Sequence, residues 1–199
     1  SYAYYLGMAL AEQRKLTQAA EVMQQGLRVR TDDVHPHLES NVFATLGDIY
    51  YQQGKQQEAY AAYDSALVYK DDNIMCLNNY AYYLSLNGEQ LDRAEEMSYR
   101  TIRQEPENIT YLDTYAWILF MKGDYAHART YMDKVVNPQK TDDELLSDQA
   151  LLGNLLEHAG DIYAHLGEHE TALRLWKLAK KKNDDTCSPQ LRKKIRQKK

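Results

Sequence analysis

Residues 40–73, SNVFATLGDIYYQQGKQQEAYAAYDSALVYKDDN, carry the pattern that decides the fold. Apolar side chains recur three or four positions apart on both sides of Gly54, a spacing that places them along one face of a helix. Gly54 interrupts this pattern, because glycine favours the backbone conformation in which helices end. The stretch therefore predicts two amphipathic helices joined by a short turn.

The same pattern occurs five times along the chain, with a basic period of 34 residues. In each copy a small residue is followed after 12 or 13 positions by an alanine. The recurring small residues are Gly7, Gly47, Ala81, Ala116 and Gly160. Because a small side chain lets two helix backbones approach closely, each copy predicts one pair of packed helices. A period of this size is typical of helical arrays in which each unit stacks on its neighbours.

The repeated sequence resembles the tetratricopeptide repeat (TPR) family. Residues 40–73 match best, and residues 153–186 match nearly as well. The residues that carry the resemblance are Phe43, Leu46, Gly47, Tyr50, Ala59, Tyr63 and Ala66 within residues 40–73, and Leu156, Gly160, Tyr163, Ala172, Trp176 and Ala179 within residues 153–186. The family's closing proline is kept only at Pro106, and alanine replaces its glycine at positions 81 and 116.

The resemblance implies an all-α fold, a right-handed superhelical α-solenoid of about five antiparallel helix pairs. We expect one array over residues 1–186, with units at about 1–33, 40–73, 74–108, 109–142 and 153–186. The segments DVHPHLES and DDELLSDQALLG precede the second and fifth units, and we expect each to extend the first helix of its unit. Residues 187–199 predict a basic C-terminal capping helix, with Ser188 as N-cap and Leu191 and Ile195 on one face.

Charge is divided unevenly along the chain. Residues 1–176 hold 14 Lys and Arg against 27 Asp and Glu, whereas residues 177–199 hold 10 Lys and Arg against 2 Asp. The body is therefore acidic and the tail basic. Cys76 and Cys187 are too few and too far apart for a disulfide framework or a cysteine-based zinc site. No apolar run is long enough to span a membrane.

The chain begins at Ser1, already inside a helical pattern and without an initiator methionine. We expect it to be a fragment whose upstream part, with any targeting signal, lies elsewhere. Its location is therefore left open between the cytoplasm and a bacterial envelope, where similar arrays also occur.

The resemblance implies a concave groove lined by four positions on the first helix of each unit. None of these twenty positions holds Lys or Arg, which disfavours capture of a peptide carboxylate or a phosphopeptide. A basic or apolar peptide fits better. We expect Tyr82 and Trp117 as apolar anchors and Asn78 as the partner of a peptide backbone. The remaining candidates are Asp48, Asp113 and Asp161, which would supply a negative field, and the secondary residues Tyr51, Phe120, Tyr4 and Glu157.

Catalysis is disfavoured. The sequence has no HExxH motif, no nucleophile elbow and no glycine-rich phosphate loop. Asp113 and Asp161 could in principle act as acid and base, but nothing in the pattern encloses them. We therefore expect a non-enzymatic scaffold for protein–protein interaction, with no catalytic residue and no cofactor.

Two further readings of charged segments are weaker. His35 and His37, with Asp32, Asp33 and Glu39 nearby, could bind a metal, but a solvated helix start fits Pro36 better, so no metal site is expected. The basic tail lacks the interleaved aromatic residues that stack on bases, so nucleic acid is an unlikely partner. The alternative function is a structural module that self-associates as a homo-oligomer or packs against upstream repeats of a longer protein.

Overall fold

The chain folds entirely into helices over the part that the structure describes. The computed structural model describes residues 2–29 and 35–197, and these contain twelve helices and no β-strand. The helices are α1 (Tyr2–Glu12), α2 (Leu16–Arg28), α3 (Pro36–Gln52), α4 (Gln56–Tyr69), α5 (Ile74–Leu86), α6 (Leu91–Gln104), α7 (Ile109–Met121), α8 (Tyr125–Val135), α9 (Asp142–Ser147), α10 (Gly153–His165), α11 (His169–Lys182) and α12 (Leu191–Gln197). The predicted all-α repeat fold is confirmed.

Short turns join the two helices of each pair. The turn glycines 54, 88, 123 and 167 all have positive φ, between 66° and 83°, a conformation that only glycine adopts without steric cost. In the first pair Arg14 takes this place with φ 58°. A side chain in that conformation costs about 1 kcal/mol, which the packing of α1 on α2 must offset.

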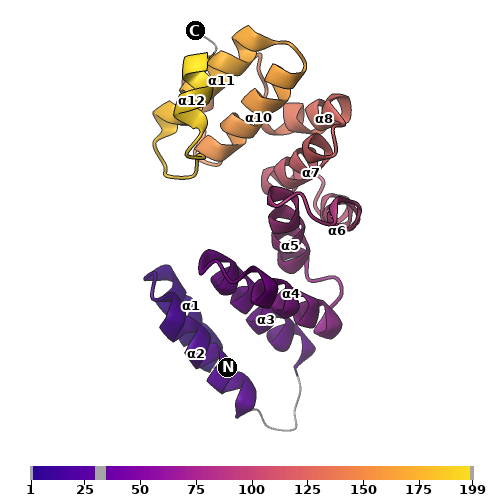
Figure 1. Cartoon of the computed structure of the whole chain (residues 1–199), viewed down its shortest axis with the longest axis vertical. Coiled ribbons are helices and arrows are strands. Elements are labelled where there is room, and N and C mark those ends of the chain that lie inside the picture. The colour runs from indigo at the N-terminus through magenta and orange to yellow at the C-terminus, as the bar shows by residue number, and fades with distance from the viewer. Residues whose placement is uncertain (1, 30–34, 198–199) are drawn as a thin grey trace. The chain divides into compact units, whose positions relative to one another are not determined.

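The helices form two compact units, residues 1–80 and 81–199, and the boundary falls inside α5. Figure 1 shows the helix pairs α1–α2 and α3–α4 within the first unit. The core of that unit joins Ala19, Ala20 and Met23 of α2 to Val42, Leu46 and Ile49 of α3. These residues lie on the apolar faces that the period of three to four residues predicts.

The recurring glycine makes room for a large side chain of the second helix in its own pair. A Cβ atom on Gly47 would lie 2.5 Å from the ring of Tyr63, and one on Gly160 would lie 2.5 Å from the ring of Trp176. Gly7 stands in the same relation to Met23. Where alanine replaces glycine, the later position holds the smaller Ser98 or the flexible Met132, both fully buried. The first helix therefore has glycine at the positions where the ring of Tyr63 or Trp176, or the side chain of Met23, packs directly against its backbone.

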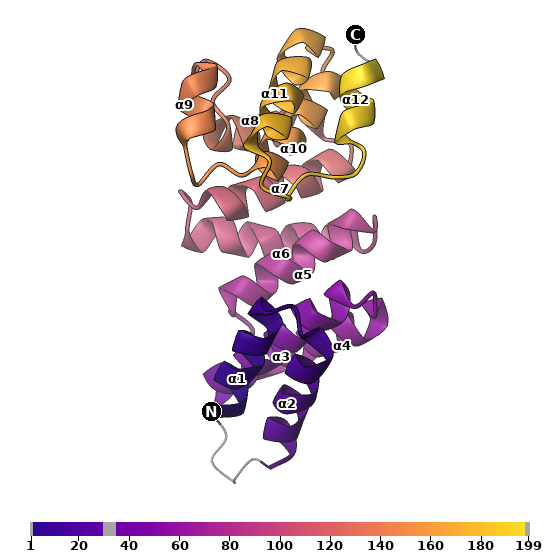
Figure 2. The same ribbon diagram turned by 90° about the vertical axis from the view of Figure 1, so that its left-hand side faces the viewer.

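The segment before the fifth repeat does not extend its first helix, contrary to the sequence prediction. Residues 142–147 form the separate helix α9, and α10 begins only at Gly153. Thr141 and Glu144 form a capping box that starts α9, and Leu145 and Leu151 are buried. Figure 2 shows α9 standing apart from α10 in the second unit. By contrast, the extension before the second repeat is helical from Pro36.

Two cations of α11 hold the α9 segment. Lys182 Nζ donates to the carbonyl oxygens of Leu146, at 3.0 Å, and Asp148, at 2.6 Å. Arg174 donates to the carbonyl oxygens of Pro138 and Lys140. Because the last carbonyls of a helix lack partners within it, Lys182 acts as a C-terminal cap for α9.

The tail ends in the short helix α12, which packs against α11 and buries Leu191. The helix begins at Leu191, and Ser188 does not cap it as predicted. Instead Ser188 donates from its backbone N–H to Glu157 of α10 at 2.7 Å, and its hydroxyl also donates to Glu157. Across the described residues, no helix combines the length and apolar character needed to cross a membrane.

Candidate functional site

The ten predicted site residues are divided between the two units. Tyr4, Asp48, Tyr51 and Asn78 belong to the first unit, and the other six belong to the second. The six residues of the second unit are Tyr82, Asp113, Trp117, Phe120, Glu157 and Asp161. Each group is therefore described within its own unit.

Asp48 of α3 is engaged by its neighbours in the first unit. Its carboxylate accepts a hydrogen bond from the Tyr63 hydroxyl, and it accepts two from Asn79 Nδ2, at 3.1 and 3.2 Å. Burial raises the pKa of Asp48 to about 6, although both hydrogen bonds oppose this shift. Asp48 is therefore a packed acceptor rather than a freely exposed charge.

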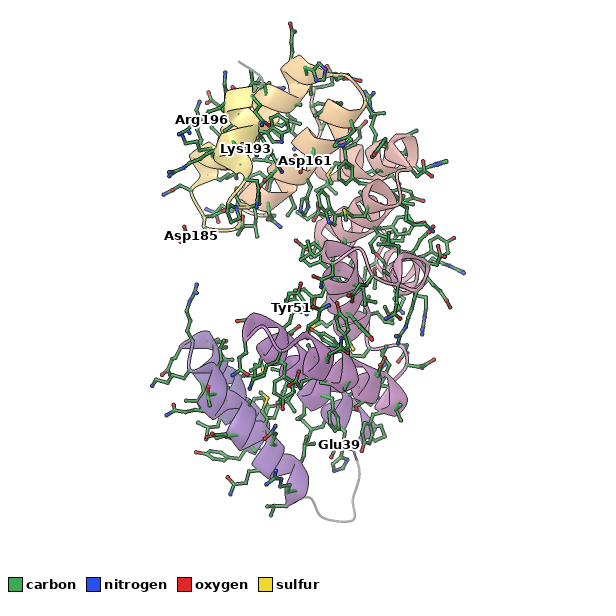
Figure 3. All side chains as sticks on the ribbon, viewed as in Figure 1. Glu39, Tyr51, Asp161, Asp185, Lys193 and Arg196 are labelled. Atoms are coloured by element: carbon green, nitrogen blue, oxygen red, sulfur yellow. The ribbon has the colours of Figure 1, made fainter. Side chains whose placement is uncertain are left out.

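The other three predicted residues of the first unit have different surroundings. Tyr4 packs partly against the core of this unit, and its ring centroid lies 5.4 Å from that of Tyr5. Asn78 is 5 % exposed, and its Oδ1 has no hydrogen-bond partner among the described residues. Tyr51 is half-buried on α3, where Figure 3 labels it.

In the second unit four rings of α7 and α10 contact one another in a row. The Trp117 ring lies 4.1 Å from the His158 ring and 4.8 Å from the Phe120 ring, both at an interplanar angle of 22°. Phe120 meets His165 edge-on at 4.8 Å. We call Trp117, Phe120, His158 and His165 the aromatic strip. The Tyr82 ring lies 6.3 Å from that of His158, beside one end of the strip.

The strip leaves part of its surface available. Trp117 and Phe120 are half-buried, whereas His158 is 7 % exposed. The indole Nε1 of Trp117 is shielded from solvent and has no hydrogen-bond partner within the described residues. An indole N–H normally finds a partner when it is buried, so this donor is an unused hydrogen-bonding group beside the stacked rings.

Beneath Trp117, Asp113 and His158 form a buried ion pair. His158 Nδ1 lies 2.9 Å from Asp113 Oδ1, and Asp113 is 4 % exposed. Burial alone would lower the pKa of His158, but the adjacent Asp113 carboxylate outweighs it and raises that pKa above its ordinary value. The pair joins α7 to α10 and holds the ring of His158 against Trp117.

Glu157 and Asp161 are bound by the tail of the chain. Lys194 Nζ lies 2.7 Å from Glu157 Oε1 and 2.6 Å from Asp161 Oδ2, and Trp176 Nε1 donates to Asp161 at 3.0 Å. Burial opposes the charged form of Glu157, but Lys194 and Ser188 together lower its pKa. Burial raises the pKa of Asp161 despite Lys194. Figure 3 shows Asp161 on α10, on the side where α12 lies.

Sequence reasoning missed His158, His165 and Lys194. One signal in the repeat could have indicated His158. His158 and Asn79 both stand two residues before the recurring small residue, and each bonds to an aspartate of the preceding repeat, Asp113 and Asp48 respectively. This position therefore contacts the first helix of the preceding repeat. Nothing comparable indicates Lys194, because the tail lies outside the repeat.

Neither cysteine is activated as a nucleophile. Burial raises the pKa of the Cys76 thiol to about 12 and that of Cys187 to about 11, so both stay protonated near neutral pH. No three His, Cys, Asp or Glu side chains among the described residues gather where they could hold a metal ion. Asp32 and Asp33, weighed as metal ligands with His35, His37 and Glu39, lie outside those residues.

Comparisons with known proteins agree with the repeat pattern. A family model described as cytochrome c-type biogenesis protein H TPR domain matches residues 5–146. No curated protein matches the chain in sequence.

Solved structures share the fold at low sequence identity. MamA of Desulfovibrio magneticus RS-1 has a TM-score of 0.68 at 13% identity, over 94% of this chain and 96% of that one. MamA of strain AMB-1 has a TM-score of 0.65 at 18% identity, over 92% and 99%. YrrB, described as a TPR protein with an unusual peptide-binding site, has a TM-score of 0.62 at 16% identity, over 92% and 86%.

Proposed function

This chain belongs to the family of cytochrome c-type biogenesis protein H TPR domains, and on that premise we propose that it is a non-enzymatic interaction module whose aromatic strip binds a peptide segment of a partner protein. The segment is apolar or basic. Peptide binding by YrrB, a structure of the same fold, supports this class of function.

The observation that carries the proposal is the stack around Trp117. Half-buried aromatic rings offer a large apolar contact at a low cost in side-chain entropy, and Trp and Tyr are enriched where binding energy is concentrated. Tyr82 lies within 6.3 Å of the strip and extends the same apolar surface.

The rings select the ligand more than the carboxylates do. His158 pairs with Asp113, and Lys194 pairs with both Glu157 and Asp161, so two cations face three carboxylates. The faces of the Trp117 indole are already stacked on His158 and Phe120, so a ligand would contact the exposed part of the ring. The exposed parts of the rings favour an apolar peptide, and the acidic body of the chain attracts a basic one over a longer range, an attraction that salt weakens.

The test is a peptide panel read by fluorescence anisotropy. Labelled Lys/Leu decapeptides are titrated with the chain, and Glu/Leu decapeptides of the same length serve as the charge-reversed set. We expect binding of the Lys/Leu set, and Trp117→Ala to weaken it by about tenfold or more, as removal of a central aromatic anchor does.

Tyr99→Ala is the matched control, because Tyr99 is a 46 % exposed ring of the second unit that lies outside the strip. It should leave binding unchanged. Equal binding of both peptide sets, or equal losses in the Trp117→Ala and Tyr99→Ala variants, would remove the strip from the binding surface.

A second candidate function is self-association through α1, and a specific observation favours it. Tyr2 is 82 % exposed, Tyr5 69 % and Met8 36 %. Residues 2–11 carry no charge. An uncharged face with three large apolar side chains suits another apolar helix, supplied by a second copy or by further repeats.

Sedimentation velocity of the chain and of Tyr5→Asp tests this candidate. A dimer that forms with rising concentration and disappears in Tyr5→Asp would support self-association. A monomer at all concentrations would leave α1 without a role in pairing copies of this chain.

A further inference from the structure

The helix α12 places one cation between two nearly buried carboxylates. Glu157 is 2 % exposed and Asp161 is 8 % exposed, and they lie one turn apart on α10. Lys194 Nζ contacts both, at 2.7 and 2.6 Å. Lys194 itself is half-buried, and it is the one cation bonded to this carboxylate pair among the described residues. The two carboxylates therefore form a binding site for a single ammonium group.

The helix that supplies this cation is weakly held. It has seven residues, and Leu191 is its one buried side chain within residues 191–197. A helix this short is not stable alone. Cavities of about 340 and 240 Å³ flank it, the larger lined by Ala179, Cys187 and Leu191 and the smaller by Ile195 and Arg196 among others. Sparse packing and few buried contacts mark elements that open locally at low free energy.

Opening of α12 would leave the carboxylates of Glu157 and Asp161 without their cation. Glu157 would lose Lys194 and both hydrogen bonds from Ser188, and Asp161 would keep only Trp176. Buried carboxylates without a cation are strongly destabilising. Asn154, one turn before Glu157 on α10, adds an Oδ1 atom that is shielded from solvent and has no partner among the described residues. The face of α10 that carries these three residues therefore binds an ammonium group through its carboxylates and offers Asn154 Oδ1 as one more hydrogen-bond acceptor.

We propose that the face of α10 carrying Asn154, Glu157 and Asp161 is a second binding site, which takes a lysine-bearing amphipathic helix, and that α12 is its intramolecular occupant. The helix of a partner protein replaces α12 by presenting a leucine one turn before its lysine, as Leu191 precedes Lys194. This site lies on α10 beside the aromatic strip and does not use its rings.

The test supplies α12 as a separate peptide. A fluorescent peptide of residues 188–199 is titrated with the unaltered chain, with Lys194→Glu and with Lys193→Glu. Lys193 is exposed next to Lys194 and is labelled in Figure 3, so its variant carries the same charge change without touching the carboxylates. Lys194→Glu drives α12 out by like-charge repulsion and opens the site.

We expect the Lys194→Glu chain to bind the peptide at least about tenfold more tightly than the other two chains, which is within the range measured for buried charge pairs. A peptide that itself carries Lys194→Glu should not bind. Equal binding by all three chains, or no binding by Lys194→Glu, would overturn the proposal. Lys194→Gln, a milder change, repeats the comparison with less risk to the fold of α10 and α11.

Hydrogen exchange in the unaltered chain tests the premise directly. Amides of residues 191–197 should exchange at least about a hundredfold faster than those in the middle of α10 and α11, because local opening of α12 exposes them. Equal protection would mean that α12 is a fixed part of the fold and not an exchangeable occupant. Trp117→Ala should leave peptide binding by Lys194→Glu unchanged, so failure here is separate from failure of the aromatic strip.

Discussion

His158 Nδ1 of α10 lies 2.9 Å from Asp113 Oδ1 of α7, and both side chains are buried. The pair links two helices through residues that are 45 positions apart in sequence. Glu157 and Asp161 also act on His158 and favour its charged form. A charged histidine buried in this way makes the stability of the second unit depend on pH.

The pKa of His158 is raised in the folded state, so its contribution to stability is complete below the ordinary pKa of histidine, about 6.5. It is lost as the pH rises through the higher folded pKa. We expect the free energy of unfolding, from urea titrations, to fall as the pH rises above about 6.5. His158→Gln should abolish this slope. Asp113→Asn should cost about 2 to 4 kcal/mol at pH 6, because it leaves a buried cation unpaired. A slope that persists in His158→Gln would place its origin elsewhere.

Asp48 predicts a second, separate pH effect. Its folded pKa of about 6 lies above the ordinary 3.8, so the folded state binds this proton more tightly. The stabilising contribution is complete below about pH 4 and is lost as the pH rises through 6. Asp48→Asn should therefore raise the free energy of unfolding by about 1 to 2 kcal/mol at pH 7. The gain should vanish near pH 4.

Asp64→Asn is the control for this prediction, because Asp64 is exposed on α4 in the same unit. It removes one charge from a side chain that is not buried, so the free energy of unfolding should change by less than about 0.5 kcal/mol at both pH 7 and pH 4. A gain equal to that of Asp48→Asn would indicate a general charge effect instead.

Gly160→Ala should destabilise the last helix pair by about 1 to 3 kcal/mol, because its Cβ would lie 2.5 Å from the Trp176 ring. The adjacent repeat suggests a rescue, since it holds Ala116 and Met132 at the same two positions, both fully buried. Gly160→Ala with Trp176→Met should recover part of the loss in thermal unfolding. The two changes would be additive if the ring were not the cause.

Lys182→Ala should loosen the α9 segment by removing the donor to the carbonyls of Leu146 and Asp148. We expect a loss of about 1 to 2 kcal/mol and faster hydrogen exchange over residues 142–152, with α10 unaffected. Lys181→Ala is the matched control, because Lys181 is exposed one residue away. Similar exchange in both variants would show that the buried Leu145 and Leu151 suffice to hold the segment.

Much of the fold could be predicted because the same residue pattern recurs about every 34 residues along the chain. Gly54, Gly88, Gly123 and Gly167 end the first helix of four pairs, as expected from glycine at positive φ. The α9 segment was predicted wrongly, because DDELLSDQALLG has helical propensity throughout. The prediction overlooked Thr141 as an N-cap, and the carbonyls that Lys182 captures are set by tertiary packing.

The site was less predictable for a related reason. Helical periodicity predicts which positions share one face of a helix, and Trp117 and Phe120 of α7 do stack on each other. The partners of the carboxylates come from distant segments, since His158 lies 45 residues beyond Asp113 and Lys194 lies 33 beyond Asp161. Such pairings depend on how neighbouring repeats and the tail pack, which the pattern within one repeat does not contain.

In each repeat the recurring small residue of the first helix is paired with one position on the second helix, and this pairing affects which side chains the first helix can expose. Where the pair is glycine with a ring, the next residue is an aspartate that bonds to that ring, as in Asp48 with Tyr63 and Asp161 with Trp176. Where it is alanine, the next residue is Tyr82 or Trp117. Two positions are therefore involved: the one after the small residue, and the partner on the second helix. Each of these four repeats carries an aromatic side chain at one of the two and not at the other. Exchange of these three residues would move the ring between the core of the helix pair and the position after the small residue on the first helix, so the surface of that helix could change in evolution or design.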